Sequence, residues 1–109
     1  MSELQGLQSR IAEIRALGYQ LMVVSPDSVE DNRRVAGRLG LDFPVLSDAG
    51  LKLTKSLGLV HPGGAPQGHD VPRPATYIIR QNTIEWEYLT DNWRVRIPPD
   101  DLLEVLRTL

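Results

Sequence analysis

Apolar residues recur at steps of three and four near the start of the chain, which predicts a helix over about residues 2–17 with a charged opposite face. Ser2 and Gln5 have the spacing of a capping box, in which each side chain satisfies a backbone amide at the helix start. Gly18 suits the left-handed position just beyond the helix end. The apolar positions of this helix are Leu4, Leu7, Ile11, Ile14 and Leu17.

Residues 19–24 form a short apolar and β-branched run, which is typical of a buried parallel strand. This run ends at Ser25. Ser28 followed by Asp31 predicts the start of a second helix, which Gly40 ends. The apolar stripe of the second helix consists of Val35, Ala36 and Leu39.

The middle of the chain gives shorter patterns. Residues 43–46 predict a short strand, and residues 51–57 predict a third short helix that ends near Gly58. Glycine and proline are dense over residues 61–74 and no periodicity survives there, which predicts a loop. A loop of this length is either mobile or functional, and the sequence leaves both alternatives open.

Residues 75–80 and 83–89 are rich in β-branched and aromatic side chains and flank Gln81 and Asn82, which predicts an antiparallel hairpin. The alternating residues that mark one face of its second strand are Ile84, Trp86 and Tyr88.

A last amphipathic helix follows Pro98 and Pro99, with Asp100 and Asp101 near its positive start. Its apolar residues are Leu102, Leu103, Val105, Leu106 and Leu109. Strand-helix alternation followed by an antiparallel pair predicts an α/β fold, a mixed sheet flanked by helices.

Composition narrows the class of protein. With 109 residues and 41% hydrophobic content, the chain predicts one compact domain over residues 1–109. Twelve basic residues against 14 acidic ones give a net charge of -2, so neither nucleic acid nor a membrane surface is an expected partner. The first ten residues do not resemble a signal peptide, and no apolar run approaches the roughly 20 residues that a bilayer needs, so a cytoplasmic protein is expected.

The chain has no cysteine. It therefore lacks disulfides, thiolate metal ligands and any thiol nucleophile, because no other side chain supplies that sulfur. Ser25, Ser47 and Ser56 lie in no GxSxG motif and have no histidine nearby in sequence, so helix caps and turns explain them better than catalysis. We expect no catalytic residue and no cofactor.

Two clusters have alternative interpretations. His61, His69 and Asp70 share the glycine-rich loop and suggest a divalent metal site, but their spacing matches no tight motif, so solvated loop side chains and no metal are expected. The second cluster is aromatic and basic, and a core-facing strand with surface arginines explains it better than a nucleic-acid surface. Its members are Trp86, Tyr88, Trp93, Arg94 and Arg96.

Three phrases in order resemble one known family. They are ELQGLQSRIAEIRALGYQLMVVSPDSVEDN, LDFPVLSDAGLKLTKSLGL and RPATYII. Together they closely resemble the AhpC/TSA peroxiredoxin-like proteins, in which a strand ending in Ser-Pro-Asp precedes the second helix, as Ser25, Pro26 and Asp27 do here. The resemblance covers nearly the whole chain and implies a thioredoxin-like fold.

The resemblance also implies a binding segment at Arg73, Pro74 and Thr76. Pro74 looks like the cis-proline that lies opposite the catalytic cysteine in thioredoxin-like folds. The alternative is a trans proline that opens a strand, where its missing amide needs no partner. Many peroxiredoxins have an arginine in place of Pro74, whereas Arg73 stands one residue earlier here.

Relative to the family, the first core strand and the peroxidatic cysteine motif are missing before the first helix. The missing strand would lie between residues 19–24 and 75–80, and two open strand edges promote pairing with another chain. We therefore predict a homodimer through unpaired sheet edges. The alternatives are direct closure of the gap into a rearranged sheet, and a natural parent protein that contains the cysteine.

The leading functional hypothesis is a peroxiredoxin-like antioxidant oxidoreductase family protein that is inactive as a thiol peroxidase in this cysteine-free form. A peroxide and a thiol reductant would be partners only of an intact parent protein. The second hypothesis is a noncatalytic binding or dimerisation module, and the third is a cysteine-independent metalloenzyme.

Overall fold

The computed structural model of the chain describes residues 3–90 and 96–109, which divide into two compact units. Unit 1 comprises Met1–Ala49 and Pro98–Leu109, and unit 2 comprises Gly50–Ile97. The expectation of one domain over residues 1–109 stays a prediction. No helix in the described ranges has the length and apolar character needed to cross a membrane.

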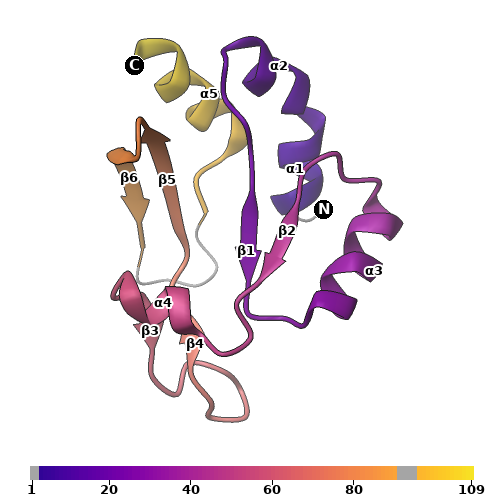
Figure 1. Cartoon of the computed structure of the whole chain (residues 1–109), viewed down its shortest axis with the longest axis vertical. Coiled ribbons are helices and arrows are strands. Elements are labelled where there is room, and N and C mark those ends of the chain that lie inside the picture. The colour runs from indigo at the N-terminus through magenta and orange to yellow at the C-terminus, as the bar shows by residue number, and fades with distance from the viewer. Residues whose placement is uncertain (1–2, 91–95) are drawn as a thin grey trace. The chain divides into compact units, whose positions relative to one another are not determined.

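The helices of unit 1 are α1 (Glu3–Ser9), α2 (Ile11–Ala16), α3 (Val29–Leu39) and α5 (Pro99–Thr108) (Figure 1). The predicted helix over residues 2–17 is interrupted at Arg10, whose backbone has φ -114° and ψ 6°. Ser9 contributes to this break, because its hydroxyl donates to the Gly6 carbonyl oxygen at 2.7 Å. The proposed cap residue Ser2 lies outside the described residues.

Helix amphipathicity determines the core of unit 1. The side chains of Leu7, Ile11 and Ile14 are buried, as their spacing predicts. On α5, Leu103 is 2% exposed, and its buried neighbours are Leu102 and Leu106. The apolar faces that the sequence identifies on α1, α2 and α5 are therefore the ones that leave water.

Charged residues connect α2 and α5 at the surface. Arg10 lies 2.7 Å from Asp100 and 3.0 Å from Glu13, and Arg107 lies 3.5 Å from Glu13. The hydrogen bond to Glu13 and the charge of Asp100 raise the pKa of Arg10 above its usual value. Because these side chains are exposed, the ion pairs orient the helices but add little stability.

Two short parallel strands complete unit 1. β1 (Val23–Ser25) pairs with β2 (Val45–Ser47), and Val24 lies opposite Leu46. The strand expected over residues 19–24 is thus shorter and displaced toward its end, because its ladder extends only as far as β2 does. The Pro44 carbonyl oxygen accepts the Val23 backbone N–H at 3.0 Å at the start of this ladder.

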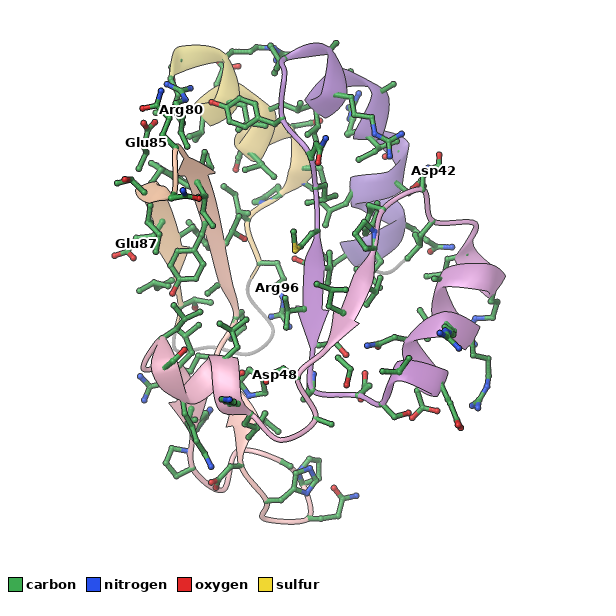
Figure 2. The ribbon with its side chains drawn as sticks, in the orientation of Figure 1. Asp42, Asp48, Arg80, Glu85, Glu87 and Arg96 are labelled. Carbon is green, nitrogen blue, oxygen red and sulfur yellow. The ribbon has the colours of Figure 1, made fainter. Side chains whose placement is uncertain are left out.

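The connection from α3 into β2 is fixed by side chains of α1 and α2. The Gln8 side-chain amide donates to the Asp42 carboxylate at 2.8 Å, and its oxygen accepts the Asp42 backbone N–H at 2.7 Å (Figure 2 labels Asp42). Arg15 donates to the Asp42 carbonyl oxygen at 2.7 Å. The sequence predicted a strand that begins at Phe43. In the structure β2 begins at Val45, and Phe43, which follows the fixed Asp42, is buried.

The predicted helix caps of α3 are confirmed. The Ser28 hydroxyl accepts the Asp31 backbone N–H at 3.1 Å, and Gly40 has φ 63° at the C-cap. The half-buried stripe residues are Val35, Ala36 and Leu39.

Unit 2 begins with α4 (Lys52–Ser56), followed by β3 (Val60–His61) and β4 (Val71–Pro72), which pair antiparallel. The predicted loop over 61–74 therefore contains a small ribbon and has its own hydrogen bonds. The Ala65 backbone N–H donates to the His69 carbonyl oxygen at 3.1 Å. At Gly64 a Cβ atom would lie 2.8 Å from a methyl group of Val71, so only glycine fits without rearrangement.

The predicted hairpin is confirmed as β5 (Ala75–Arg80) and β6 (Thr83–Leu89) (Figure 1). A register shift follows the pair of Ile78 with Trp86, since Ile79 then lies opposite Ile84. Glu85 is the extra residue of this bulge, and it pairs with Arg80 at 3.4 Å (Figure 2).

The strands form three separate two-stranded ladders within the described ranges. In unit 1, β1 has one ladder partner, β2, and in unit 2, β5 has one ladder partner, β6. Each of these strands therefore has an edge that no strand in the described ranges occupies, which we call its open edge.

The turn of the hairpin generates a stability prediction. Gln81 and Asn82 both have positive φ, 52° and 62°, which is the geometry of a turn that favours Asn-Gly. The double substitution Gln81→Asn and Asn82→Gly should raise the free energy of unfolding by about 1 kcal/mol, because it removes left-handed strain from Gln81. Urea titration followed by circular dichroism measures the change. The opposite substitution, Asn82→Val, should lower stability, and an increase would contradict this explanation.

Candidate functional site

The binding segment implied by the resemblance lies in unit 2, where the chain passes from β4 into β5. Arg73 continues the ribbon, because its backbone N–H donates to the Leu59 carbonyl oxygen at 2.7 Å. Pro74 is buried and Thr76 is half-buried. The three residues thus lie on one connected backbone segment. A binding role for this segment stays a prediction.

The Arg73–Pro74 peptide bond is trans, so the cis geometry implied by the resemblance is not found. Pro74 stands between the last residues of the small ribbon and the first residue of β5. At this junction its missing N–H interrupts no ladder bond. Pro74 is therefore a trans proline directly before a strand, as in the alternative interpretation of the sequence.

The hairpin face beside this segment is aromatic. Thr76 lies opposite Tyr88, and the rings of Trp86 and Tyr88 stack with centroids 6.4 Å apart. On the other face, burial raises the pKa of the Tyr77 phenol, and the carboxylate of Glu87 directly across the hairpin raises it further. Trp86 and Tyr88 share a half-buried face as predicted, but the prediction is wrong for Ile84. The bulge at Glu85 places Ile84 opposite Ile79 on the other face of the hairpin, where it is 47% exposed. Trp93 and Arg94 lie outside the described residues.

A second polar cluster, which the sequence did not reveal, lies at the ends of β1 and β2 in unit 1. The Ser25 hydroxyl accepts the Asp27 backbone N–H at 3.0 Å and lies 3.2 Å from the Asp27 carboxylate and 2.9 Å from the Asn32 amide oxygen. The Ser47 hydroxyl donates to the Asp27 carbonyl oxygen at 2.6 Å. Side chains at the carboxyl ends of two parallel strands thus meet the start of α3.

Asn32 is the unusual member of this cluster. Its residue is 4% exposed, and its Nδ2 atom has no hydrogen-bond partner among the described residues. The Ser25 hydroxyl has a single proton, so it satisfies either Asn32 or Asp27 at one time. The polar contacts of Asn32 are therefore incomplete, and burial of such a group destabilises a fold.

A signal for Asn32 was present in the sequence. Asn32 stands three, four and seven residues before Val35, Ala36 and Leu39, on the apolar stripe of α3. A polar residue on such a stripe predicts a buried polar contact. The apolar positions alone therefore do not describe the inner face of α3.

The described residues contain no group of three or more histidine, cysteine, aspartate or glutamate side chains able to hold a metal ion. The Asp70 carboxylate accepts the Gly63 backbone N–H at 3.0 Å. The His61 ring lies where a Cβ atom on Gly64 would be 2.9 Å from it. The loop residues therefore contact other residues of the same loop. His69 takes part through its carbonyl oxygen, which accepts the Ala65 backbone N–H.

The cluster at Asn32 generates a prediction with opposite signs for two substitutions. Asn32→Leu should raise the free energy of unfolding by about 1 kcal/mol, because it removes an incompletely bonded amide while Ser25 keeps its bonds to Asp27. Ser25→Ala should lower it by roughly 1–3 kcal/mol, since the Asn32 oxygen then loses the hydroxyl that it contacts. Urea unfolding of both variants measures this. Arg33→Leu, on the exposed face of α3, controls for an added leucine, and a less stable N32L protein would contradict the argument.

Comparison with known proteins gives the family and the fold. The family model described as AhpC/TSA matches residues 1–86. No curated protein matches the sequence.

Three solved structures illustrate the fold similarity. A cysteine-to-serine mutant of peroxiredoxin 6 of Arenicola marina is 21% identical with TM-score 0.81, and the match covers 96% of this chain and 52% of that one. Reduced Prx3 from Vibrio vulnificus is 17% identical with TM-score 0.88, covering 97% and 70%. Peroxidoxin BcpB from Mycobacterium tuberculosis is 18% identical with TM-score 0.79, covering 98% and 68%.

The chain therefore spans about half to two-thirds of the length of these peroxiredoxins. The similarity confirms the thioredoxin-like α/β fold expected from the sequence. Because the family model matches most of the residues, the chain belongs to the AhpC/TSA family.

Proposed function

We propose that this chain is inactive as a thiol peroxidase by itself and acts as a noncatalytic peroxiredoxin-family module that pairs with a second copy through its open strand edges. The observation that carries the proposal is the combination of a peroxiredoxin fold, no cysteine, and two strands that each have one ladder partner among the described residues. The reasons are the chemistry of sulfur and the hydrogen bonding of the backbone.

Thiol peroxidase chemistry needs a thiolate that attacks the peroxide oxygen. A serine hydroxyl does not replace a thiolate, because it stays protonated near neutral pH without an activating base. Ser25, which lies at the end of β1, is hydrogen bonded to Asp27 and Asn32, and neither of these is a histidine base. A structural role therefore explains the hydrogen bonds of Ser25 better than a catalytic role does.

The backbone hydrogen bonds of β1 indicate which of its residues faces the open edge. The Val23 N–H donates to the Pro44 carbonyl oxygen, and the Ser25 carbonyl oxygen accepts the Asp48 N–H at 2.7 Å. In a parallel ladder, alternate residues direct both backbone groups to the same neighbour. Val23 and Ser25 therefore face β2, and the N–H and C=O of Val24 face the open edge.

A second copy suits this edge for two reasons. Two β1 strands that run antiparallel about Val24 exchange both of its backbone bonds, which gives a closed two-fold interface. The net charge of -2 gives little repulsion between copies. Pro26 limits the pairing to a short stretch because it has no N–H, so the open edge of β5 in unit 2 offers a second place for contact.

The catalytic part of the proposal is tested by peroxide consumption. The purified chain with dithiothreitol should consume hydrogen peroxide no faster than the buffer with the reductant alone, because it has no thiolate. Absorbance or a peroxide-sensitive dye follows the reaction. Sustained turnover, beyond the stoichiometric oxidation of the protein, would contradict the proposal. The Ser25→Ala variant would then decide whether that hydroxyl is responsible.

The pairing part is tested at Val24. Val24→Pro removes the N–H that faces the open edge and leaves the bonds of Val23 and Ser25 to β2 in place. We expect its dimer dissociation constant to rise about tenfold or more, because a symmetric interface loses that bond twice. Analytical ultracentrifugation over a range of concentrations measures it.

The matched control is Val24→Thr, which keeps the backbone N–H and the β-branched shape and should associate like the parent chain. If the proline variant does not fold, Val24→Lys adds charge at the same edge and should weaken association instead. A parent chain whose mass stays that of a monomer at every concentration would contradict pairing.

A further inference from the structure

The sulfur of this chain is confined to two methionines, Met1 and Met22. Met1 lies outside the described residues. Met22 is 62% exposed, which is high for a large apolar side chain. Peroxides oxidise an exposed thioether to a sulfoxide, and the susceptibility of a methionine follows its exposure. Met22 is thus the accessible sulfur atom in the described part of this peroxiredoxin-family scaffold.

Met22 lies directly before the first residue of β1. Side chains alternate along an extended strand, so Met22 belongs to the same face as Val24. Val24 in turn lies opposite Leu46 on β2. Val24 is 41% exposed and Leu46 is 46% exposed. Met22, Val24 and Leu46 thus form a small exposed apolar surface beside the open edge of β1, which we call the edge patch.

We propose that Met22 is a peroxide modification site whose oxidation weakens strand pairing at the open edge of β1. The effect on pairing rests on the proposed function, whereas the oxidation itself does not. The oxidant is a hydroperoxide, which is the class of substrate implied by the family.

The reaction balances without a thiol. A lone pair on the Met22 sulfur attacks the outer peroxide oxygen, the O–O bond breaks, and a sulfur–oxygen bond forms. The hydroxyl proton moves to the leaving oxygen. The leaving group is thus released as water from hydrogen peroxide, or as an alcohol from an alkyl hydroperoxide. The thioether is oxidised by two electrons and the peroxide is reduced by two. Methionine sulfoxide reductases reverse the product to the thioether.

The consequence follows from polarity. A thioether in the edge patch is apolar, and its burial against a second copy favours association. A sulfoxide is strongly polar and loses hydrogen bonds to water when the same surface is covered. Oxidation should therefore raise the dimer dissociation constant by about tenfold or more, because burial of one apolar side chain corresponds to about that factor and a two-fold interface contains Met22 twice.

Thermodynamic linkage requires the reverse effect as well. If the sulfoxide weakens pairing, formation of the sulfoxide must be less favourable in the paired chain. Pairing also covers the thioether, so Met22 should react more slowly at high protein concentration because its exposure is reduced. The exposure of Met22 also means that its sulfoxide remains accessible to water in a single copy. Oxidation should therefore leave the folded structure of the unpaired chain intact.

The experiment treats the full chain with hydrogen peroxide and maps the added oxygen by peptide mass spectrometry. Free methionine in the same tube gives the reference rate. Oxidation of Met22 at a rate comparable to free methionine supports the modification site, and a Met22 that stays reduced under these conditions overturns it. Circular dichroism before and after treatment separates oxidation from unfolding.

The regulatory arm compares the dissociation constant of the treated and untreated chain. Met22→Leu is the matched control, because leucine is apolar, similar in size and not oxidised, so its association should not respond to peroxide. If Val24→Pro disrupts the dimer but oxidation of Met22 leaves its dissociation constant unchanged, the regulatory role is wrong while the proposed function stands. If the untreated chain does not associate, the proposed pairing and this regulation both fail, and the mapping still decides whether Met22 is modified.

Discussion

The open edge of β1 is a consequence of backbone hydrogen bonding in a parallel ladder. In such a ladder each residue directs its N–H and C=O to one side. In a strand with one neighbour, the backbone groups of only every second residue are therefore hydrogen bonded within the ladder. β1 has three residues, and Val23 and Ser25 are bonded to the β2 segment. Val24 between them faces the open edge. The open edge at Val24 and the expectation of a partner follow from this arrangement.

The hydrophobic core of unit 1 makes such an edge possible without unfolding. Leu7, Ile14 and Leu103 are buried on helices that do not belong to the sheet. Apolar burial on α1, α2 and α5 supplies stability that is independent of the strand edge. The Gln8 and Asp42 hydrogen bonds then hold β2 in place from the helical side. A short ladder is sufficient because the helices provide the core.

Family membership and catalytic chemistry depend on different parts of the molecule. The AhpC/TSA match and the thioredoxin-like fold concern the backbone and the core, whereas peroxidase chemistry depends on one sulfur atom that the chain does not contain. A fold does not imply a function, since functions reside in sites placed on folds. The described residues of this chain include the open edges of β1 and β5, a polar cluster around the buried Asn32 and the exposed thioether of Met22.

The sequence by itself determined the helical faces, the caps of α3, the hairpin and the absence of cysteine from this chain, because these depend on local spacing and on residue types. Tertiary structure decided the length of β1, the trans bond before Pro74 and the incomplete bonding of Asn32. The ends of a strand depend on how far its partner extends, and the satisfaction of a buried amide depends on residues far away in sequence. Neither is encoded in local periodicity.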